Sequence, residues 1–506
     1  MLFIPLALSA FTHLWNPIGF PSIHIDEGAY YMDRAFLVLN GLGPQKEGAP
    51  YDHPYFGWLF LAGIFEIIEY PESLNPQPGN VSSVEMIYLV PRVAMGLLAI
   101  LDTFLIYKIS ERHYNRNVAF IAALLFAVMP FSWLIRRILL ESVQLPFILS
   151  SILFSLYASD SRNTYHKNTL LSLVSGTLLG IAIFTKVPAV TMIPLTSFII
   201  LKDSSTAINR KIKLQKLGLF LLPVIAIPLI WPAYALSLGE IDRWVEGLIW
   251  QANRVGTSLV GALWNFYVID PVLFVLGIVG LSYVLAVKRD IFLFMFSIPF
   301  LIFLYLIEFV SVWHLVPLLP AFVIAVAVII SDLINKFTSK RFKSQVGFIV
   351  ISSIGIFGLV STTMLITTDL NLFHFKAVAF ASKIITDLNS DKSSREDKLT
   401  VIGSHRYFWM IPHLFDKEHR HDYKNIFSRS NITTEKVLFI ADNAVARVIA
   451  SEDRGFEQTR KMYNDTQIVA KFGEDRIFYD KTRYPYTSVE YNAPPEWIEI
   501  RTDIMK

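Results

Sequence analysis

Cysteine is missing from this sequence, and charged residues are scarce. The lack of cysteine excludes disulfides, thiolate nucleophiles and cysteine-ligated zinc together. Charged residues make up 17% of the 506 residues, whereas hydrophobic residues make up 53%. A soluble protein needs about a quarter of its residues charged to cover its surface. Much of the surface must therefore face lipid, and the net charge of +3 is too small to indicate nucleic acid as a partner.

Signals of other protein classes are also missing. Residues 1–20 are apolar but carry neither a basic start nor a small-residue cleavage site, so they predict a first transmembrane helix and not a removable signal. They also lack a basic cytoplasmic flank, so we expect the gene product to begin slightly upstream. No glycine-rich phosphate loop follows a predicted strand, and no internal repeat of the kind that builds many transporters is evident.

The long apolar stretches predict a polytopic α-helical membrane protein. A membrane span needs about 20 mostly apolar residues. About eleven stretches meet that condition, near 2–20, 86–107, 118–135, 142–158, 169–185, 187–201, 216–236, 269–287, 291–309, 314–332 and 345–366.

The basic residues of the connections predict the orientation. Cytoplasmic loops are enriched in Lys and Arg. Alternate connections hold Lys108, Arg112, Arg116, Arg162, Lys167, Lys202, Arg210, Lys211, Lys213, Lys288, Arg289, Lys336, Lys340, Arg341 and Lys343. We therefore expect a cytoplasmic amino terminus and an extracytoplasmic carboxyl terminus.

Two predicted outer segments are large. Residues 21–85 form a first outer loop, in which the apolar stretch 55–69 is short for a span and suits a helix at the membrane interface. Residues 369–506 have an ordinary polar composition and predict a small α/β domain, with helices at 376–389 and 442–453 and buried strands at 399–403 and 436–442. We thus expect a membrane domain over 1–368 and an extracytoplasmic domain over 369–506. Three glycosylation triplets fall in these outer segments, at Asn80, Asn431 and Asn464.

The pair Asp26–Glu27 follows the first predicted span directly. Two adjacent carboxylates repel each other and are costly to desolvate, which makes them a poor choice for stability alone. One of them can act as a general base on an acceptor hydroxyl or amine while the other holds it or binds a cation. The alternative is an exposed acidic loop, since such pairs are ordinary on surfaces.

A second polar segment, Asp52-His53-Pro54-Tyr55, precedes the interfacial stretch. Pro54 fixes the turn, and Asp52 and His53 can face the same cavity as Asp26. The alternative for Asp52 is an N-terminal cap of the following helix.

Several ionisable residues lie within or at the edge of predicted spans. Such residues cost about 2.5–3.5 kcal/mol each on insertion scales and are functional candidates by default. An arginine offers two-pronged hydrogen bonding to phosphate oxygens, and its alternative role is snorkelling at a helix end. The candidates are Arg92, Arg136, Arg137, Glu141 and Lys186, of which all but Arg92 map to the same predicted membrane face as the two polar segments above.

These segments together resemble the polyprenyl-phosphate-dependent glycosyltransferases of the GT-C type, over about residues 1–330. Among these enzymes, the sequence is most similar to the dolichyl-phosphate-mannose–protein mannosyltransferases and the lipid A aminoarabinose transferases. Residues 24–27 resemble their Asp-Glu motif, and 52–57 resemble a His-Pro-Pro-Leu-Gly segment with Tyr55 in place of the second proline. Residues 136–142 resemble an Arg-Tyr-Ile-Leu-Leu-Asp-Ser stretch with Glu141 in place of aspartate. Phe184-Thr185-Lys186 resembles their lysine motif. Residues 315–320 resemble a late Leu-Pro-x-x-Pro span.

The resemblance implies roles for the candidates. Asp26 would be the general base, with Glu27 beside it. Arg136, Arg137, Lys186 and Arg92 would bind the donor phosphate, and Asp52, His53, Glu141 and His314 would shape the site. No cofactor is implied with certainty. A divalent metal is left open, with His53 or His314 and a carboxylate as candidate ligands.

We therefore expect an inverting transferase that moves a hexose or pentose, such as mannose, from a polyprenyl or dolichyl phosphate to a protein, glycan or lipid on the outer membrane face. The predicted connection at 237–268 is too short for the inserted lumenal domain of the eukaryotic protein mannosyltransferases, which weakens the case for a protein acceptor. The main alternative is a transporter or flippase of lipid-linked glycans, which predicts ionisable groups at the bilayer midplane. A membrane-anchored sensor would leave the clustered acids and bases unexplained, and the Trp-Trp-Asp signature of oligosaccharyltransferases is absent.

Overall fold

The structure is a computed structural model that describes residues 1–45, 49–160, 164–202, 210–336, 339–390, 398–416, 420–428, 432, 434, 436–473 and 497–503. Two residues used above, Arg162 and Asn431, lie outside these ranges. The chain divides into two compact units. The first unit comprises residues 1–15, 47–57 and 93–366, and the second comprises 16–46, 58–92 and 367–506. The second unit thus joins two parts of the first outer loop to the carboxyl-terminal segment, a grouping that the sequence had not indicated.

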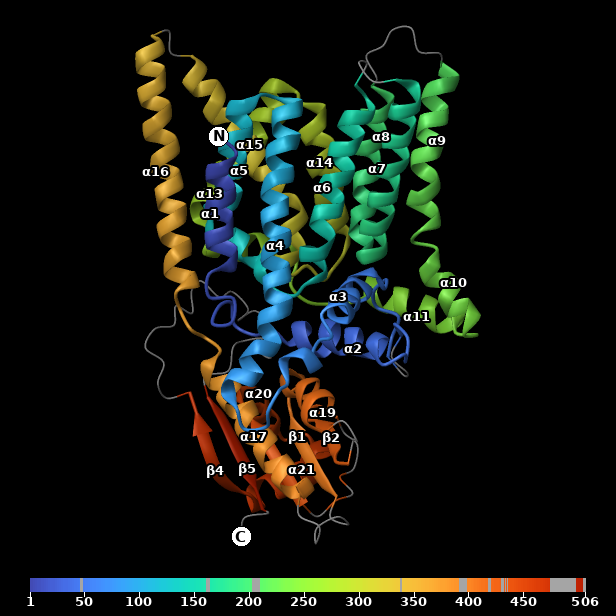
Figure 1. Cartoon of the computed structure of the whole chain (residues 1–506), viewed down its shortest axis with the longest axis vertical. Coiled ribbons are helices and arrows are strands. Elements are labelled where there is room, and N and C mark those ends of the chain that lie inside the picture. Colours follow the sequence, from blue (N-terminus) through green and yellow to red (C-terminus); the bar gives the residue numbers. More distant parts are fainter. Residues whose placement is uncertain are drawn as a thin grey trace. The chain divides into compact units, whose positions relative to one another are not determined.

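The first unit is a bundle of apolar helices (Figure 1). Its helices and short helical turns are α1 (Phe3–Leu14), the last two-thirds of α4 (Val81–His113), α5 (Arg116–Val128), η3 (Pro130–Arg136), α6 (Leu140–Ala158), α7 (Tyr165–Thr185), η4 (Val187–Met192), α8 (Ile193–Leu201), α9 (Arg210–Ala226), α10 (Ile230–Ser237), α11 (Ile241–Ala252), α12 (Leu259–Ile269), α13 (Pro271–Tyr283), η5 (Val284–Lys288), α14 (Ile291–Leu306), η6 (Val312–Leu318), α15 (Leu319–Asn335) and α16 (Lys340–Ile366).

The lengths of these helices agree with a multi-pass membrane protein. Among the described residues, seven helices are long and apolar enough to cross a membrane, and an eighth span is counted if the bent pair α5–η3 is taken as one. Three further predicted spans coincide with shorter apolar helices at Phe3–Leu14, Val187–Leu201 and Ile291–Leu306. The structure therefore accounts for all eleven predicted stretches as apolar helices, while only seven or eight of them reach spanning length.

Two of the predicted spans differ in shape from the expectation. The first was expected over 2–20, but α1 ends at Leu14, since Asn16 has a positive φ of 47° and precedes Pro17, whose ring disfavours helical geometry in the preceding residue. The span expected over 118–135 bends by 68° where α5 gives way to η3 at Pro130. This bend is important for the site, because η3 ends at Arg136.

The bundle packs around helices that are apolar on every side. In α15 every residue from Leu319 to Val328 is buried, and in α5 every residue from Val118 to Val128 except Phe120. A helix that is hydrophobic all round belongs in the centre of an assembly. Helix α15 packs against α5 and α13, and α7 lies between α6 and α9 (Figure 1).

The second unit contains an irregular loop, several short helices and one sheet. Its elements are η1 (Glu27–Met32), α2 (Asp33–Leu39), most of α3 (Phe56–Ile67), η2 (Glu72–Leu74), the start of α4, α17 (Leu372–Ser390), β1 (Leu399–Gly403), α18 (His405–Phe408), α19 (Met410–Phe415), β2 (Asp422–Asn425), β3 (Lys436–Ala441), α20 (Asn443–Ala450), η8 (Arg454–Phe456), α21 (Glu457–Asp465), β4 (Gln467–Phe472) and β5 (Ile498–Thr502). The twelve-residue α3 confirms a short helix in the stretch expected at the membrane interface.

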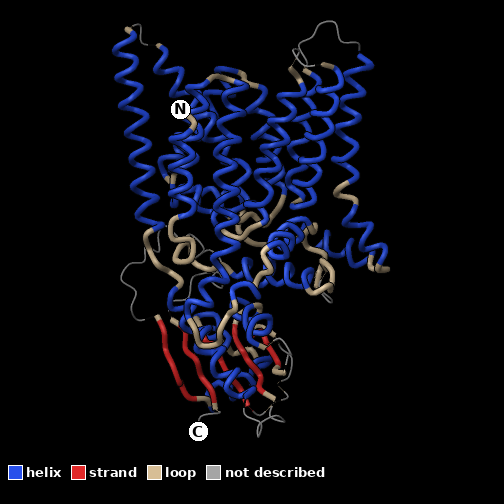
Figure 2. Tube along the Cα trace, viewed as in Figure 1, coloured by secondary structure: helices blue, strands red, loops and turns tan. Residues whose placement is uncertain are grey.

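The strands form one mixed sheet in the order β2-β1-β3-β5-β4 (Figure 2). Strand β1 runs parallel to β2 and β3, whereas β5 runs antiparallel to β3 and β4. The central strands β1 and β3 are buried almost throughout, as expected for parallel strands covered on both faces. Helix α17 packs against β4 and β5. The small α/β domain predicted from the sequence is therefore confirmed, including strands at 399–403 and 436–441, a helix that covers 376–389 and a helix within 442–453.

Candidate active site

The predicted site residues fall in both units. Asp26, Glu27 and Arg92 belong to the second unit. The other candidates belong to the first unit, namely Asp52, His53, Arg136, Arg137, Glu141, Lys186 and His314. Each set is described within its own unit.

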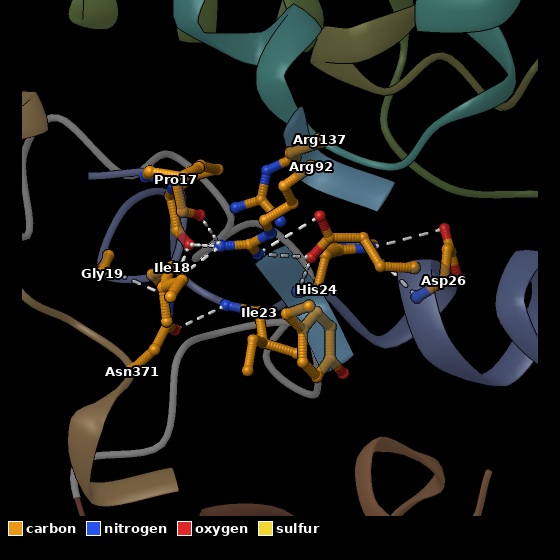
Figure 3. Close-up of polar contacts among 12 residues, drawn as sticks. Pro17, Ile18, Gly19, Ile23, His24, Asp26, Arg92, Arg137 and Asn371 are labelled. Carbon is orange, nitrogen blue, oxygen red and sulfur yellow. Dashed lines mark hydrogen bonds and ion pairs between the residues drawn. The ribbon is translucent and has the colours of Figure 1, made fainter. Parts of the chain in front are cut away.

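In the second unit, Glu27 and Arg92 form a buried ion pair (Figure 3). Arg92 Nη2 donates to Glu27 Oε1 at 3.2 Å and to Oε2 at 2.9 Å. Glu27 Oε2 also accepts the backbone N–H of His24 at 2.8 Å. Both oxygens of Glu27 are therefore engaged and its side chain is 0% exposed, so this carboxylate is neutralised within the protein.

The neighbouring carboxylate, Asp26, has a different environment. Its side chain is 28% exposed. Its backbone N–H donates to His24 Nδ1 at 3.2 Å, and its Oδ2 lies 3.6 Å from the same ring nitrogen (Figure 3). The two adjacent acids thus differ in exposure, because Glu27 is fully buried while Asp26 is 28% exposed.

An unusual helical turn begins immediately after Asp26. Residues Glu27–Met32 form a π-helical turn, η1, which leads directly into α2. Such turns are rare and occur frequently at functional sites. Within η1, Gly28 lies against Trp409, and a Cβ atom added at residue 28 would overlap the indole ring. Glycine is therefore required here by close approach of a side chain and not by its φ angle.

In the first unit, Glu141 is the centre of a second buried cluster. Lys186 Nζ is paired with Glu141 Oε1, and His314 Nε2 lies 3.8 Å from the same oxygen. The other carboxylate oxygen, Oε2, is buried and has no hydrogen-bond partner among the described residues. A buried carboxylate oxygen without a partner is costly, so this atom is a candidate contact for a ligand.

The segments that resembled family motifs meet in this cluster. Tyr55 packs edge-on against the ring of Phe184 at 6.3 Å, and Gly57 approaches Leu140 and Thr185 closely. Residues 52–57, the start of α6 and the end of α7 therefore contact one another, although more than 120 residues of sequence separate the first from the last. The structure brings together three of the four motifs that carry the candidate residues.

The two adjacent arginines lie at the end of η3. Arg136 and Arg137 are each 1% exposed. Arg136 Nη2 donates to the backbone oxygen of Trp15, and the guanidinium of Arg137 lies 5.4 Å from the centre of the Trp133 ring. Both are thus held inside the protein and do not snorkel to its surface.

The chain at Tyr51 and Asp52 is held by α11 and by Glu240, the residue directly before that helix. Gln251 Nε2 donates to the backbone oxygen of Asp52 at 2.9 Å, and the hydroxyl of Tyr51 donates to Glu240 at 2.6 Å. Burial, followed by the carboxylate of Glu240, raises the pKa of Tyr51. Helix α3 begins only at Phe56, so Asp52 lies too early to be its N-cap, and that alternative is excluded. Asp52 Oδ1 instead accepts the N–H of His53 at 3.0 Å.

Sequence patterns did not indicate two residues that contact these sites. Gln144 lies one turn after Glu141 and donates to the backbone oxygens of Ala182 and Lys186, which fixes the end of α7. Asn371 makes four hydrogen bonds to the segment that precedes Asp26, across about 350 residues of sequence. Neither residue carries a charge or belongs to a motif, so no local signal was available for them.

The described residues contain no group of three or more His, Asp or Glu side chains arranged to hold a metal ion. The second unit has a cavity of about 450 Å³ between the ends of α2 and α3 and helix α19. Its wall includes Phe36, Phe65, Glu66, Tyr70 and His413, and none of the predicted site residues.

A family model matches part of the chain. Residues 82–231 match the family model described as dolichyl-phosphate-mannose-protein mannosyltransferase. No curated protein matched the chain.

Solved structures share the fold at low sequence identity. ArnT from Cupriavidus metallidurans bound to undecaprenyl phosphate is 10% identical, with a TM-score of 0.54 over 99% of this chain and 97% of that one. The apo oligosaccharyltransferase of Archaeoglobus fulgidus is 13% identical, with a TM-score of 0.54 over 83% of this chain and 64% of that one. The same archaeal enzyme in complex with Zn and sulfate gives 12% identity and a TM-score of 0.55 over 91% and 71%. This chain thus spans just under two-thirds of the length of the apo archaeal enzyme.

The family match and the shared fold confirm the resemblance seen in the sequence motifs: this chain is a multi-pass membrane protein with the fold of the GT-C-type glycosyltransferases.

Proposed function

We propose that the protein is an inverting glycosyltransferase that takes a sugar from a polyprenyl or dolichyl phosphate on the outer membrane face. The observation that carries this proposal is the contrast between two adjacent acids, since Glu27 is buried and paired while Asp26 is 28% exposed. A general base must be able to reach the proton that it removes. Asp26 satisfies that condition, and Glu27 does not.

The reaction is a single displacement. The acceptor oxygen or nitrogen attacks the anomeric carbon and forms the new glycosidic bond, while the bond from that carbon to the carrier phosphate breaks. The electron pair leaves with the lipid phosphate, and the proton of the acceptor passes to the carboxylate of Asp26. Attack from the face opposite the phosphate inverts the anomeric configuration.

The cations of the first unit are proposed to bind the leaving phosphate. Arg136, Arg137 and Lys186 are buried, and fixed cations in a site that excludes water stabilise developing negative charge more strongly than solvent does. The ArnT structure with undecaprenyl phosphate, which shares this fold, supports a lipid-phosphate donor.

Arg92 receives a different role from the one that the sequence suggested. Its guanidinium is occupied by Glu27 and by three backbone oxygens, so we assign it to holding the Asp26 loop and not to phosphate binding. Glu27 is likewise assigned to support. Asp52, His53 and His314 remain proposed as residues that shape the site, and Glu141, through Oε2, as a contact to the donor sugar.

The archaeal relative with Zn leaves metal dependence as a question for this chain. His53, His314 and Glu141 are the nearest candidate ligands, but the described residues do not form a three-ligand group. The reaction is written with side chains alone, and transfer measured with and without a chelator tests whether a divalent metal takes part.

Transfer from a radiolabelled polyprenyl-phosphate sugar tests the proposal, with the protein in membranes and a panel of acceptors. We expect wild type to consume the donor and Asp26→Asn to lower the transfer rate by about 10²–10⁴-fold, the usual contribution of a general base. Arg136→Ala should weaken donor binding. Asp33→Asn is the matched control, because it makes the same chemical change at a buried acid that is hydrogen-bonded to His413.

Two results would contradict the proposal. Normal turnover by Asp26→Asn would remove the base assignment. Movement of the labelled lipid across the bilayer without sugar transfer would instead support a transporter of lipid-linked glycans.

A further inference from the structure

The segment between Asn16 and Asp26 has little regular structure of its own. It is nevertheless buried, with Phe20 at 0% and Ser22 at 3% exposure. The backbone oxygens of Pro17, Ile18, Gly19 and Pro21 therefore need hydrogen-bond donors from elsewhere in the unit, because buried carbonyls without partners cost free energy.

One set of donors comes from Arg92 in α4. Its Nη1 donates to the backbone oxygens of Pro17 at 3.0 Å and Pro21 at 2.8 Å, with a longer contact of 3.4 Å to Ile18. Its Nη2 holds Glu27, as described above. A single guanidinium thus joins both ends of the segment that carries Asp26.

The second set of donors comes from Asn371, directly before α17 (Figure 3). Its Nδ2 donates to the backbone oxygens of Ile18 at 2.7 Å, Pro21 at 2.8 Å and Gly19 at 3.2 Å. Its Oδ1 accepts the N–H of Ile23 at 2.9 Å. An uncharged carboxamide is suited to this position because it both donates and accepts, whereas a carboxylate only accepts.

The carboxyl-terminal segment also contacts the chain just after Asp26. Trp409 covers Gly28 in η1, and its Nε1 donates to the hydroxyl of Tyr88 at 3.2 Å. Tyr88 lies one turn before Arg92, whose guanidinium is 5.5 Å from the Tyr88 ring. Asp26 is therefore flanked on one side by the segment that Asn371 holds and on the other by the turn that Trp409 covers.

We infer that Asn371 and Trp409 are positioning residues, and that the carboxyl-terminal segment serves to fix the orientation of Asp26. This inference rests on the proposed function, in which Asp26 is the base. It assigns the segment a role in the chemical step itself. A segment that only recruited the acceptor would change acceptor affinity and leave the chemical step intact.

The test uses the full-length protein with Asn371→Asp, which keeps the shape of the side chain but removes both Nδ2 donors. We expect kcat to fall about 100-fold, the size of loss that a displacement of about 1 Å can produce, with the KM for acceptor unchanged. The pH profile of kcat should shift, because a displaced Asp26 has a different environment. Asn168→Asp is the matched control, since Asn168 is equally buried but donates to the backbone oxygen of Asp160 in the other unit.

Hydrogen exchange at residues 16–28 separates this inference from the proposed function. Faster exchange in this segment for Asn371→Asp, with the fall in kcat, supports the inference. Unchanged exchange overturns it, and so does faster exchange with normal kcat in an enzyme that is otherwise active. Absence of transfer by wild type would overturn the proposed function and, with it, the catalytic role of the segment, whereas unchanged exchange in an active enzyme would overturn this inference alone.

A second variant guards against misfolding of Asn371→Asp. Trp409→Phe removes the donor to Tyr88 and part of the cover over Gly28 while keeping an aromatic ring. It should lower kcat with acceptor KM unchanged and speed exchange near Gly28. A rise in acceptor KM with normal kcat would instead indicate an acceptor-binding role and overturn the inference.

Discussion

Each unit has a buried candidate carboxylate, Glu27 in the second unit and Glu141 in the first. Both are paired with a cation, but they differ in how many of their oxygens have hydrogen-bond partners. Both oxygens of Glu27 are engaged by Arg92, and one of them also accepts the N–H of His24. Only one oxygen of Glu141 is engaged, by Lys186, and the other has no hydrogen-bond partner among the described residues.

This difference distinguishes an ion pair with a structural role from an ion pair that is a candidate for ligand binding. A fully hydrogen-bonded ion pair rigidifies its surroundings, while a partly satisfied one keeps an atom available for a ligand at a cost in stability. The sequence named Glu27, Arg92, Glu141 and Lys186 as candidate site residues and did not show how completely each one is hydrogen-bonded. In the structure, Glu27 and Arg92 hold the loop before Asp26, while Glu141 keeps one buried oxygen without a hydrogen-bond partner among the described residues.

The largest expected effect comes from breaking the satisfied pair. Arg92→Met leaves the carboxylate of Glu27 buried without its cation, so we expect a loss of about 3–5 kcal/mol in stability. The midpoint of thermal unfolding in detergent measures it. Arg243→Met is the control, since Arg243 forms a partly exposed pair with Glu240, with side chains 38% and 28% exposed, and should cost about 1 kcal/mol. Equal losses in the two variants would show that the buried pair contributes no more to stability than the partly exposed pair.

Substitution in the partly satisfied pair should lower stability less than Arg92→Met does. Glu141→Gln keeps an amide oxygen that can accept a hydrogen bond from Lys186, so we expect a loss of about 2 kcal/mol, which is less than for Arg92→Met, where the whole cation is removed. Its larger effect should be on ligand binding. Polyprenyl phosphate sugar should raise the unfolding midpoint of wild type and raise that of Glu141→Gln much less. A full ligand-induced shift in the variant would remove Glu141 from the donor site.

Substitutions at Gly28 and Trp409 test whether the loop next to the Glu27–Arg92 pair is tightly packed. Gly28→Ala adds a methyl group where the indole ring lies, and such overpacking costs about 1–3 kcal/mol. Trp409→Phe makes space, so the double variant should recover part of the lost stability and activity. Additive losses in a double-mutant cycle would contradict the contact.

The smallest expected effect is a dependence of stability on pH in the carboxyl-terminal segment. Burial, with Arg406 and Arg92 adding repulsion, lowers the pKa of His374 to about 3. The unfolded chain binds a proton near pH 6.5 and the folded chain does not, so stability is full above pH 6.5 and falls as the pH drops toward 3. We expect a loss of about 1 kcal/mol at pH 5.5, which follows from the two pKa values.

Hydrogen exchange in β1 and β3 between pH 5 and 7 measures this dependence after correction for the intrinsic rate. His374→Phe keeps the stacking on Tyr407, whose ring centre lies 5.1 Å from that of His374, and removes the titrating group. The variant should show a flatter profile. An unchanged profile would exclude His374 as its source.

Runs of apolar residues along the chain were enough to predict many of the helices and strands. Long apolar runs indicated where helices such as α4, α6 and α16 would lie, and continuous β-branched and aliphatic runs indicated β1 and β3. They did not indicate β2, the edge strand β4 or helix α12, because these elements have mixed polarity or lie in a stretch that was expected to be a loop. Residue type and spacing along the chain also indicated Asp26, Glu141 and Lys186 as candidates.

Only the tertiary structure decided what those residues contact. Glu27 and Arg92 are separated by 65 residues, and Asn371 and Ile18 by 353. The chain between such residues can follow many paths of similar local energy, and packing of the whole unit selects one of them. By itself, then, the sequence determined which segments are apolar and which residues can carry charge. The fold decided which carboxylates are buried and how completely each one is hydrogen-bonded, because burial and hydrogen bonding depend on partners distant in the chain.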